Sequence, residues 1–288
     1  MYVVAGVTGH TGAVVANTLL DQGKKVRVLV RSADKGAAFA ARGAEVAIVS
    51  LDDSAALTKA LAGATGAYLL VPPDHTSEEV IARGHRIVDA ITTAVKAAKV
   101  PHVVFLSSIG AQHEKGTGPI TQLHYAEKQL AGVTQATFLR PGYFFENLLN
   151  MLGAIKGQGV LPVFADPDFA FPMLATVDIG RAAVAALLDP PGRGRQSRVL
   201  ELNGPKSRTL SEAAAAFAKA LDKPVHVVRV PDEGAIPAMR GAGMSADLAR
   251  LYLEMNHAVG QGLFAFDGHK LVTGTTTLET FVDQAVRS

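Results

Sequence analysis

The first dozen residues place a short apolar run, residues 2–5, directly before three glycines spaced three apart, Gly6, Gly9 and Gly12. An apolar-rich stretch over 13–20 follows at once. Because glycine permits sharp turns and close backbone approach, this order predicts a strand, a tight turn and a helix. The N–H groups and the positive dipole at the start of such a helix favour a bound pyrophosphate. The spacing, G-x-x-G-x-x-G, differs from the G-x-G-x-x-G of most dinucleotide sites.

A second strand, predicted over 25–30, closes a βαβ unit of about thirty residues. Sites that prefer NAD usually place an acidic residue directly after this strand, where it binds the ribose hydroxyls. Here Arg31 takes that place, Ser32 offers a hydroxyl, and Lys35 adds a second cation. Two cations favour a 2′-phosphate, so the sequence indicates NADP(H) as the cofactor. The alternatives are a solvated pair of cations and a nucleotide-free turn.

Strands and helices alternate beyond this unit. We expect strands over 44–49, 66–71, 102–107 and 135–139, and helices over 35–42, 54–61, 77–98 and 122–131. Alternation of this kind predicts an α/β fold with a doubly wound parallel sheet (a Rossmann fold), which binds ligands at the carboxyl ends of its strands. The cofactor contacts expected there are Gly6, Thr8, Gly9, His10, Thr11, Gly12, Arg31, Lys35, Val71, Pro72, Ser107, Pro141 and Tyr143.

The regular alternation ends near residue 143. We expect a dinucleotide-binding domain over 1–150, with 176–203 returning to it through a helix at 177–188 and a strand at 198–202. The remainder of 151–288 is expected to form mostly a smaller substrate-binding lobe, with helices at 210–221 and 247–256 and a strand at 225–230. Such a lobe would cover the reactive end of the cofactor and form a substrate cleft.

Bulk composition excludes several classes of protein. The chain has 288 residues, is 48% hydrophobic and contains no cysteine, which rules out disulfides and thiolate metal sites, and we expect no metal. No apolar run approaches a membrane span and the start lacks a signal-peptide pattern, so we expect a cytoplasmic protein with no membrane contact. The net charge is only +2, and Arg193-Gly194-Arg195 is too short a basic turn to bind nucleic acid. We expect a monomer or homodimer that acts on a small molecule.

Two clusters look chemical. Ser107 and Ser108 end a strand, where hydroxyls either polarise a substrate carbonyl and hold the nicotinamide side or simply form a turn. His124 and Lys128 are four residues apart on a predicted helix and therefore share one of its faces.

The chain resembles the NmrA-like family of atypical short-chain dehydrogenases. The resemblance spans nearly the whole chain and rests on the glycine turn, on Leu-Ser-Ser-Ile-Gly-Ala at 106–111, on Leu-Arg-Pro-Gly-Tyr-Phe-Phe-Glu-Asn at 139–147 and on the tail at 273–281. Short-chain dehydrogenases carry Tyr-x-x-x-Lys on the corresponding helix, with Tyr as acid/base and Lys on the ribose. The resemblance therefore implies that Lys128 binds the cofactor ribose and that His124 stands in the Tyr place, both as catalytic residues. The alternative for His124 is a packing role.

The family implies NADP(H) and this fold, and leaves the reaction open. It includes quinone reductases, dye reductases, plant ether reductases and redox sensors without turnover. We expect first an NADPH-dependent reductase of a quinone or similar conjugated acceptor, whose product oxygen is protonated by His124 or by water. The second hypothesis is a redox sensor that binds NADP(H) and signals its state. The third, a sugar-nucleotide epimerase or dehydratase, is disfavoured because the basic Tyr is missing.

Overall fold

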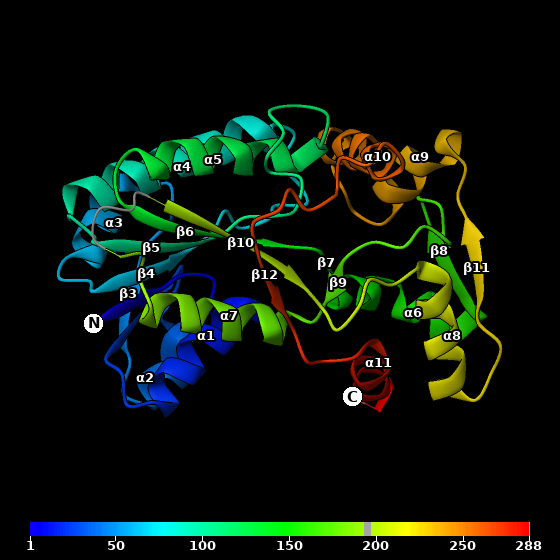
Figure 1. Ribbon diagram of the computed structural model, residues 1–288, viewed down its shortest axis with the longest axis horizontal. Coiled ribbons are helices and arrows are strands. Elements are labelled where there is room, and N and C mark those ends of the chain that lie inside the picture. The colour runs from blue at the N-terminus through cyan, green and yellow to red at the C-terminus, as the bar shows by residue number, and fades with distance from the viewer. Residues whose placement is uncertain (193–196, 288) are drawn as a thin grey trace.

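The computed structural model describes residues 1–192 and 197–287, and its centre is an eight-stranded sheet (Figure 1). Arg193-Gly194-Arg195 lies outside the described residues. Every neighbouring pair of strands in the sheet is parallel. Across the sheet the order is β3 (Glu45–Ile48), β2 (Val26–Val30), β1 (Tyr2–Val4), β4 (Gly66–Leu69), β5 (His102–Leu106), β6 (Gln135–Pro141), β10 (Ser197–Asn203) and β12 (Lys270–Thr273). The predicted doubly wound parallel sheet is confirmed.

Helices cover both faces of the sheet (Figure 1). One face carries α1 (His10–Asp21), α2 (Ala37–Ala40) and α7 (Thr176–Leu188), and the other carries α3 (Ser54–Leu61), α4 (Val80–Ala97) and α5 (Thr121–Ala131). Each layer has its own apolar core, one around Leu19, Val28 and Ile179 and the other around Leu57, Ile91 and Phe105. Helices α1 and α7 approach closely because Gly180 has no side chain: a Cβ there would lie 2.5 Å from a methyl of Val14. The central strands β4 and β5 are almost wholly buried because helices cover both faces of the sheet.

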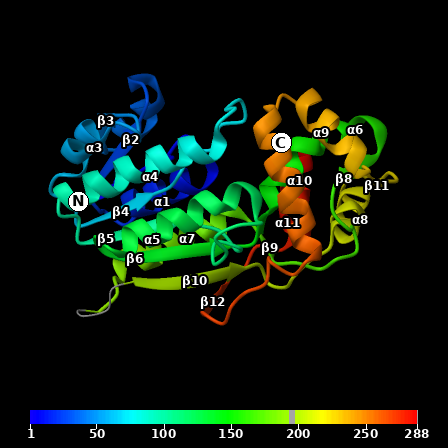
Figure 2. The same cartoon turned by 90° about the horizontal axis from the view of Figure 1, so that it is seen from above.

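The segments after β6 gather mostly beyond the carboxyl ends of the strands (Figures 1 and 2). They form a third apolar core that includes Phe145, Leu161 and Phe217. The elements there are β7 (Tyr143–Phe144) paired with β9 (Met173–Leu174), β8 (Val160–Val163) paired with β11 (His226–Arg229), the 3-10 helix Phe145–Met151, α6 (Leu152–Gln158), α8 (Leu210–Leu221), α9 (Asp232–Gly241), α10 (Ala246–Gly260) and α11 (Leu278–Arg287). Helix α8 begins at a capping box of Thr209 and Glu212.

Several elements after residue 143 were not predicted from the sequence: β7, β8, β9, α6 and α11, and also β12 and α9. Strand β12 closes the far edge of the main sheet by pairing with β10, although its residues are mostly exposed and show no apolar alternation. Only this pairing makes the segment a strand, which is why the sequence pattern gave no signal. Helix α9 carries Pro237 in its interior, a residue that normally argues against a helix.

Helix α10 is anchored above the carboxyl ends of the strands by polar contacts with the segment after β4. The hydroxyl of Ser245 donates to the carbonyl of Ser77 at 2.6 Å, and a carboxylate oxygen of Asp247 accepts from the N–H of Val80 at 3.0 Å. These contacts join residues about 170 positions apart and fix the start of α10 against the segment after β4.

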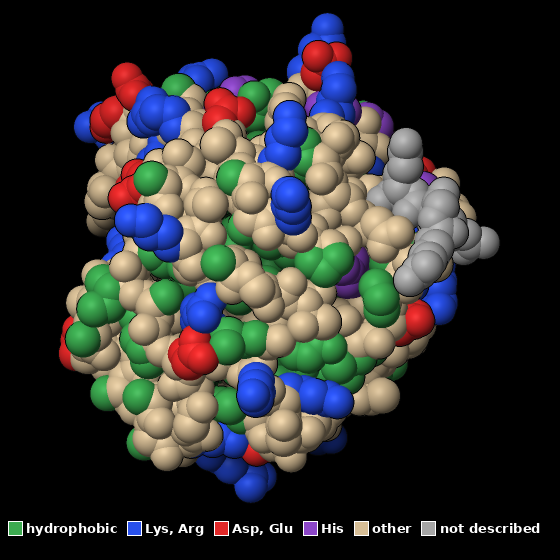
Figure 3. All heavy atoms as spheres, turned by 90° about the vertical axis from the view of Figure 1, so that its left-hand side faces the viewer, with side chains coloured by type: hydrophobic (Ala, Val, Ile, Leu, Met, Phe, Trp, Pro, Cys, Tyr) green, Lys and Arg blue, Asp and Glu red, His purple; other side chains and the backbone are tan. Residues whose placement is uncertain are grey.

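The surface offers no single dominant patch on the face seen in Figure 3, where basic and acidic side chains are interspersed among small apolar areas. Within residues 1–192 and 197–287, no helix is both long and apolar enough to cross a lipid bilayer.

Candidate active site

The glycine turn leaves three backbone donors free at the start of α1. Gly6 has a positive φ of 67°, and its carbonyl accepts the N–H of Gly9 at 3.0 Å, which closes the turn. Gly9 is the N-cap of α1 and supplies no side-chain cap. Within the described part of the chain, the N–H groups of His10, Thr11 and Gly12 have no hydrogen-bond acceptor. Uncapped donors at a helix start form an anion site.

The glycines in this turn differ in how much space a side chain would have. A Cβ on Gly12 would lie 2.4 Å from the carbonyl oxygen of Gly6, so the fold itself excludes a side chain there. A Cβ on Gly9 would meet no protein atom closer than 3.4 Å. Thr8, Gly9 and His10 are exposed, so the space in front of Gly9 is open. The protein does not need this space for packing, which fits a bound phosphate.

Thr11 points inward. Its hydroxyl is buried and accepts a hydrogen bond from the hydroxyl of Tyr68 at 2.9 Å. We therefore assign the expected cofactor contact of Thr11 to its backbone N–H.

The end of β2 presents free positive charge. Arg31 is exposed and has no ion-pair or hydrogen-bond partner among the described residues. Lys35 lies 3.8 Å from the carboxylate of Asp34, which is also exposed. The hydroxyl of Ser32, and then the charge of Lys35, lower the pKa of Asp34. Arg31 is thus free to bind an anion, whereas Lys35 already has a weak, solvated partner.

The segment after β4 forms the wall beside the glycine turn. Val71 and Pro72 are half-buried, and the guanidinium of Arg83 donates to the carbonyl of Pro72 at 3.1 Å. Arg83 also pairs with Asp74 at 3.3 Å, which holds this segment in place. Leu70, directly before it, packs where a Cβ of Gly6 would be, at 2.6 Å.

Ser107 at the end of β5 belongs to a buried charge network. Its hydroxyl donates to Glu127 of α5 at 2.5 Å, and Glu127 binds Arg140 of β6 through two hydrogen bonds of 3.0 and 2.7 Å. Arg140 also pairs with Asp267 at 3.0 Å. Since the proton of Ser107 is committed to Glu127, the expectation that Ser107 polarises a substrate carbonyl does not fit this geometry. The oxygen of Ser107 can still accept a hydrogen bond from a ligand.

Sequence reasoning did not single out Glu127 and Arg140. The available signal was Arg140 itself, because a charged residue at the end of an apolar strand must find a buried partner. The partner could not be identified from the sequence.

His124 and Lys128 line a groove between α5 and the strands β6 and β10, here called the α5 groove, whose volume is about 610 Å³. A ring nitrogen of His124 hydrogen-bonds the carbonyl of Ala111 at 2.9 Å, and Lys128 is exposed. The groove wall contains Glu127 and Arg140, with Ser107 behind them. No other residue expected to contact the cofactor lines the described walls of this groove. The described walls of the α5 groove thus hold His124 and Lys128 and no residue of the glycine turn.

The run at 139–147 contains both buried and partly exposed residues. Pro141 is buried as the last residue of β6. Glu146 accepts the N–H of Thr176 at 3.0 Å and its hydroxyl at 2.5 Å, and so caps α7. Tyr143, in contrast, is half-buried and its hydroxyl has no partner among the described residues. Tyr143 is therefore the side chain of this run that remains available to a ligand.

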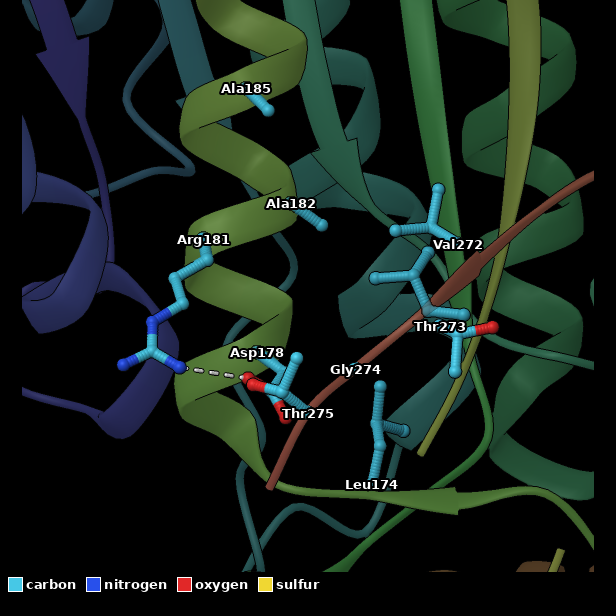
Figure 4. Close-up of a pocket in the computed structure, with 10 residues that line it drawn as sticks. Leu174, Asp178, Arg181, Ala182, Ala185, Val272, Thr273, Gly274 and Thr275 are labelled. Carbon is cyan, nitrogen blue, oxygen red and sulfur yellow. Dashed lines mark hydrogen bonds and ion pairs between the residues drawn. The ribbon is translucent and has the colours of Figure 1, made fainter. Parts of the chain in front are cut away.

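A smaller pocket of about 260 Å³ lies between α7 and the segment that follows β12 (Figure 4). Asp178 accepts the N–H of Thr276 at 2.8 Å and pairs with Arg181 at 3.1 Å at its rim. Ala182 and Ala185 face this pocket, whereas Gly180 faces α1. The pocket thus lies on the side of α7 away from the glycine turn, and Asp178 holds the chain that joins β12 to α11.

Comparisons with known proteins agree with this fold. The sequence model of the NmrA-like family matches residues 2–282. An NAD(P)H azoreductase of Xenophilus azovorans is 30% identical over 259 residues, which cover 86% of this chain and 84% of that protein. Quinone oxidoreductase 2 of Escherichia coli strain K12 is 28% identical over 289 residues, 96% of each chain. The crystal structure of the NADPH-dependent quinone oxidoreductase QOR2 of E. coli with NADPH superposes with a TM-score of 0.82 at 27% identity, covering 99% of this chain and 100% of that one.

Proposed function

This chain belongs to the NmrA-like family, and on that premise we propose that it is a reductase that passes hydride from NADPH to a quinone or a similar conjugated small-molecule acceptor. The resemblance seen in its motifs is confirmed by the family match. The chain is an oxidoreductase that uses NADP(H), as its azo- and quinone-reducing relatives are named to do.

The observation that carries the proposal is the open helix start at Gly9, with Arg31 directly after β2 and without a partner among the described residues. The free N–H groups before α1 suit the pyrophosphate, and Arg31 with Lys35 suits the 2′-phosphate. We propose that the cofactor is held by Gly6, Thr8, Gly9, His10, Thr11, Gly12, Arg31, Lys35, Val71, Pro72, Ser107, Pro141 and Tyr143.

Reduction of a conjugated acceptor needs little acid–base catalysis by the protein. When bound, NADPH supplies the hydride, and the residues around it orient it, exclude water and present the acceptor. The product oxygen is a stable anion that water can protonate. Because His124 lies in the α5 groove, we assign this proton to water rather than to His124. A ribose contact by Lys128 likewise has no geometric support, since Lys128 lines the same groove.

The test is NADPH oxidation measured against a panel of quinones, azo dyes, triphenylmethane dyes and aldehydes, with NADPH affinity measured in parallel by calorimetry. We expect turnover with quinones, and weak or no turnover with aldehydes, which need a proton donor. Tight NADPH binding without turnover of any acceptor would refute the reductase and favour a redox sensor. Absence of NADPH binding would refute both.

A further inference from the structure

The α5 groove has the size of a small-molecule site. Its volume of about 610 Å³ is more than twice that of the pocket beside α7, and sites for small molecules span roughly 300–1,000 Å³. It is lined by α5, by strands β6 and β10, and by Ala111, Gln112 and His269. None of the proposed cofactor contacts belongs to these described walls, so a ligand held within them leaves the cofactor site free.

The floor of the α5 groove is apolar. Phe138 of β6 and Val199 of β10 are direct partners in the parallel register, so their side chains point to the same face of the sheet. Ala111 and Ala131 also line the groove, and their short side chains leave room beside this floor. The floor therefore suits the apolar body of a ligand, such as an aromatic ring.

Two of the three cations in the described walls already have anionic partners. Arg140 is bound by Glu127, through hydrogen bonds of 3.0 and 2.7 Å, and by Asp267 at 3.0 Å. Arg198 pairs with the carboxylate of Asp189 at 3.2 Å. These two guanidinium groups therefore offer little uncompensated charge to a ligand.

Lys128 is the third cation, and its ammonium group has no ion-pair or hydrogen-bond partner among the described residues. The two histidines of the walls are engaged. A ring nitrogen of His124 hydrogen-bonds the carbonyl of Ala111 at 2.9 Å, and His269 lies 3.4 Å from the carboxylate of Asp267. The groove thus presents one uncompensated positive charge beside an apolar floor.

A second unpaired polar group lies in the same walls. The hydroxyl of Ser197, at the start of β10, is buried and has no hydrogen-bond partner within residues 1–192 and 197–287. Buried hydroxyls nearly always have a partner, because leaving one unpaired is costly. An acceptor atom of a ligand at this end of the groove would supply that partner.

From the charge, the floor and the size of this cavity we propose that the α5 groove is a second ligand site, for a small organic monoanion. Its ligand is an aromatic carboxylate, whose charge pairs with Lys128 and whose ring lies on Phe138 and Val199. One uncompensated cation matches one negative charge. The site is distinct from the proposed cofactor contacts and does not depend on the proposed reductase function.

The test compares 2-naphthoate with 2-naphthamide, a neutral molecule of nearly the same shape, by calorimetric titration with NADPH at saturation. Because NADPH fills the proposed cofactor site, the titration reports binding elsewhere. We expect naphthoate to bind about fivefold more tightly than naphthamide, the scale of a partly exposed ion pair. Without NADPH, the Kd of naphthoate should agree within about twofold, so the result does not require a working reductase.

The matched variants are Lys128→Met and Lys96→Met. Methionine keeps an apolar stem and removes the charge, so Lys128→Met should weaken naphthoate about fivefold and leave naphthamide unchanged. Lys96 is an exposed lysine near the end of α4, outside the described walls of the groove, and its replacement should change neither Kd.

A third variant, Ala131→Phe, fills the groove without altering its charge. Both naphthalene compounds should bind about 10-fold more weakly or worse, since the new ring takes the space of theirs. NADPH affinity within about twofold of wild type verifies that this variant is folded.

Several results would overturn the second site. These are no binding of naphthoate, equal affinity for naphthoate and naphthamide, displacement of naphthoate by NADPH, and unchanged naphthoate binding in Lys128→Met or in a folded Ala131→Phe. If wild-type protein reduces no acceptor, the proposed function fails and the naphthoate titrations still decide on the groove.

Discussion

The glycine turn gives the sharpest prediction. Packing against the backbone excludes a side chain at Gly12, whereas at Gly9 only a bound phosphate would exclude one. We compare Gly9→Val with Gly12→Ala. The backbone of Gly9 is extended, with φ −104° and ψ −179°, which any residue adopts, and a Cβ there would have 3.4 Å of clearance. The backbone around Gly12 leaves only 2.4 Å to the carbonyl oxygen of Gly6.

The expected stabilities follow from these distances. Valine is a poorer N-cap than glycine by about 1 kcal/mol, and Gly9→Val should lose no more than that. Gly12→Ala would push two backbone segments apart. Overpacking of this kind lowers the free energy of unfolding by roughly 1–3 kcal/mol, and we expect a loss near the upper end of that range. With about 2.1 cal/mol/K of unfolding entropy per residue, 288 residues give about 0.6 kcal/mol/K. Gly9→Val should therefore melt within about 2 °C of wild type, and Gly12→Ala about 5 °C lower.

Gly9→Val should lose cofactor affinity even though its stability is nearly that of wild type. The side chain of Gly9→Val occupies the space in front of the free N–H groups of α1, so NADPH affinity should fall at least about 100-fold in a folded protein. Calorimetric titration with NADPH and thermal unfolding by circular dichroism measure the two quantities. Normal NADPH binding by Gly9→Val, or a wild-type melting temperature for Gly12→Ala, would refute the reading of this turn.

Three further predictions concern charge. Arg31→Ala should weaken NADPH about 10- to 100-fold and change NADH far less, because an unpaired guanidinium at this place binds the 2′-phosphate; equal losses for both cofactors would contradict this. Lys128 and His124 line the α5 groove, so Lys128→Ala and His124→Ala should each leave NADPH affinity and quinone turnover within about twofold of wild type across pH 5 to 9. A tenfold loss of affinity or turnover in one of these variants would support the role that the resemblance implies for that residue. Burial, and then the nearby Arg198, lower the pKa of His102 to about 4, so the folded protein keeps this ring neutral while the unfolded chain protonates it below about 6.5. Stability should thus fall by up to about 3 kcal/mol as pH drops from 6.5 to 4, and denaturant titrations of His102→Gln should show a correspondingly flatter profile; a parallel profile would contradict the assignment.

The sequence by itself determined what depends on neighbours along the chain. The strand, glycine turn and helix at residues 2–21 are local, and so is the position of Arg31 after the second strand. Apolar strands separated by amphipathic helices fix a parallel sheet, because each helix must bury its apolar face against the strands it joins. The spacing of His124 and Lys128 correctly placed both on one face of α5.

Tertiary structure alone decided which way that face points. Helical periodicity says which residues lie together and not what they lie against, so only the packed α5 shows Glu127 turned to Ser107 and Lys128 turned to the groove. The pairing of β12 with β10 joins segments about 70 residues apart, and no local pattern marks it.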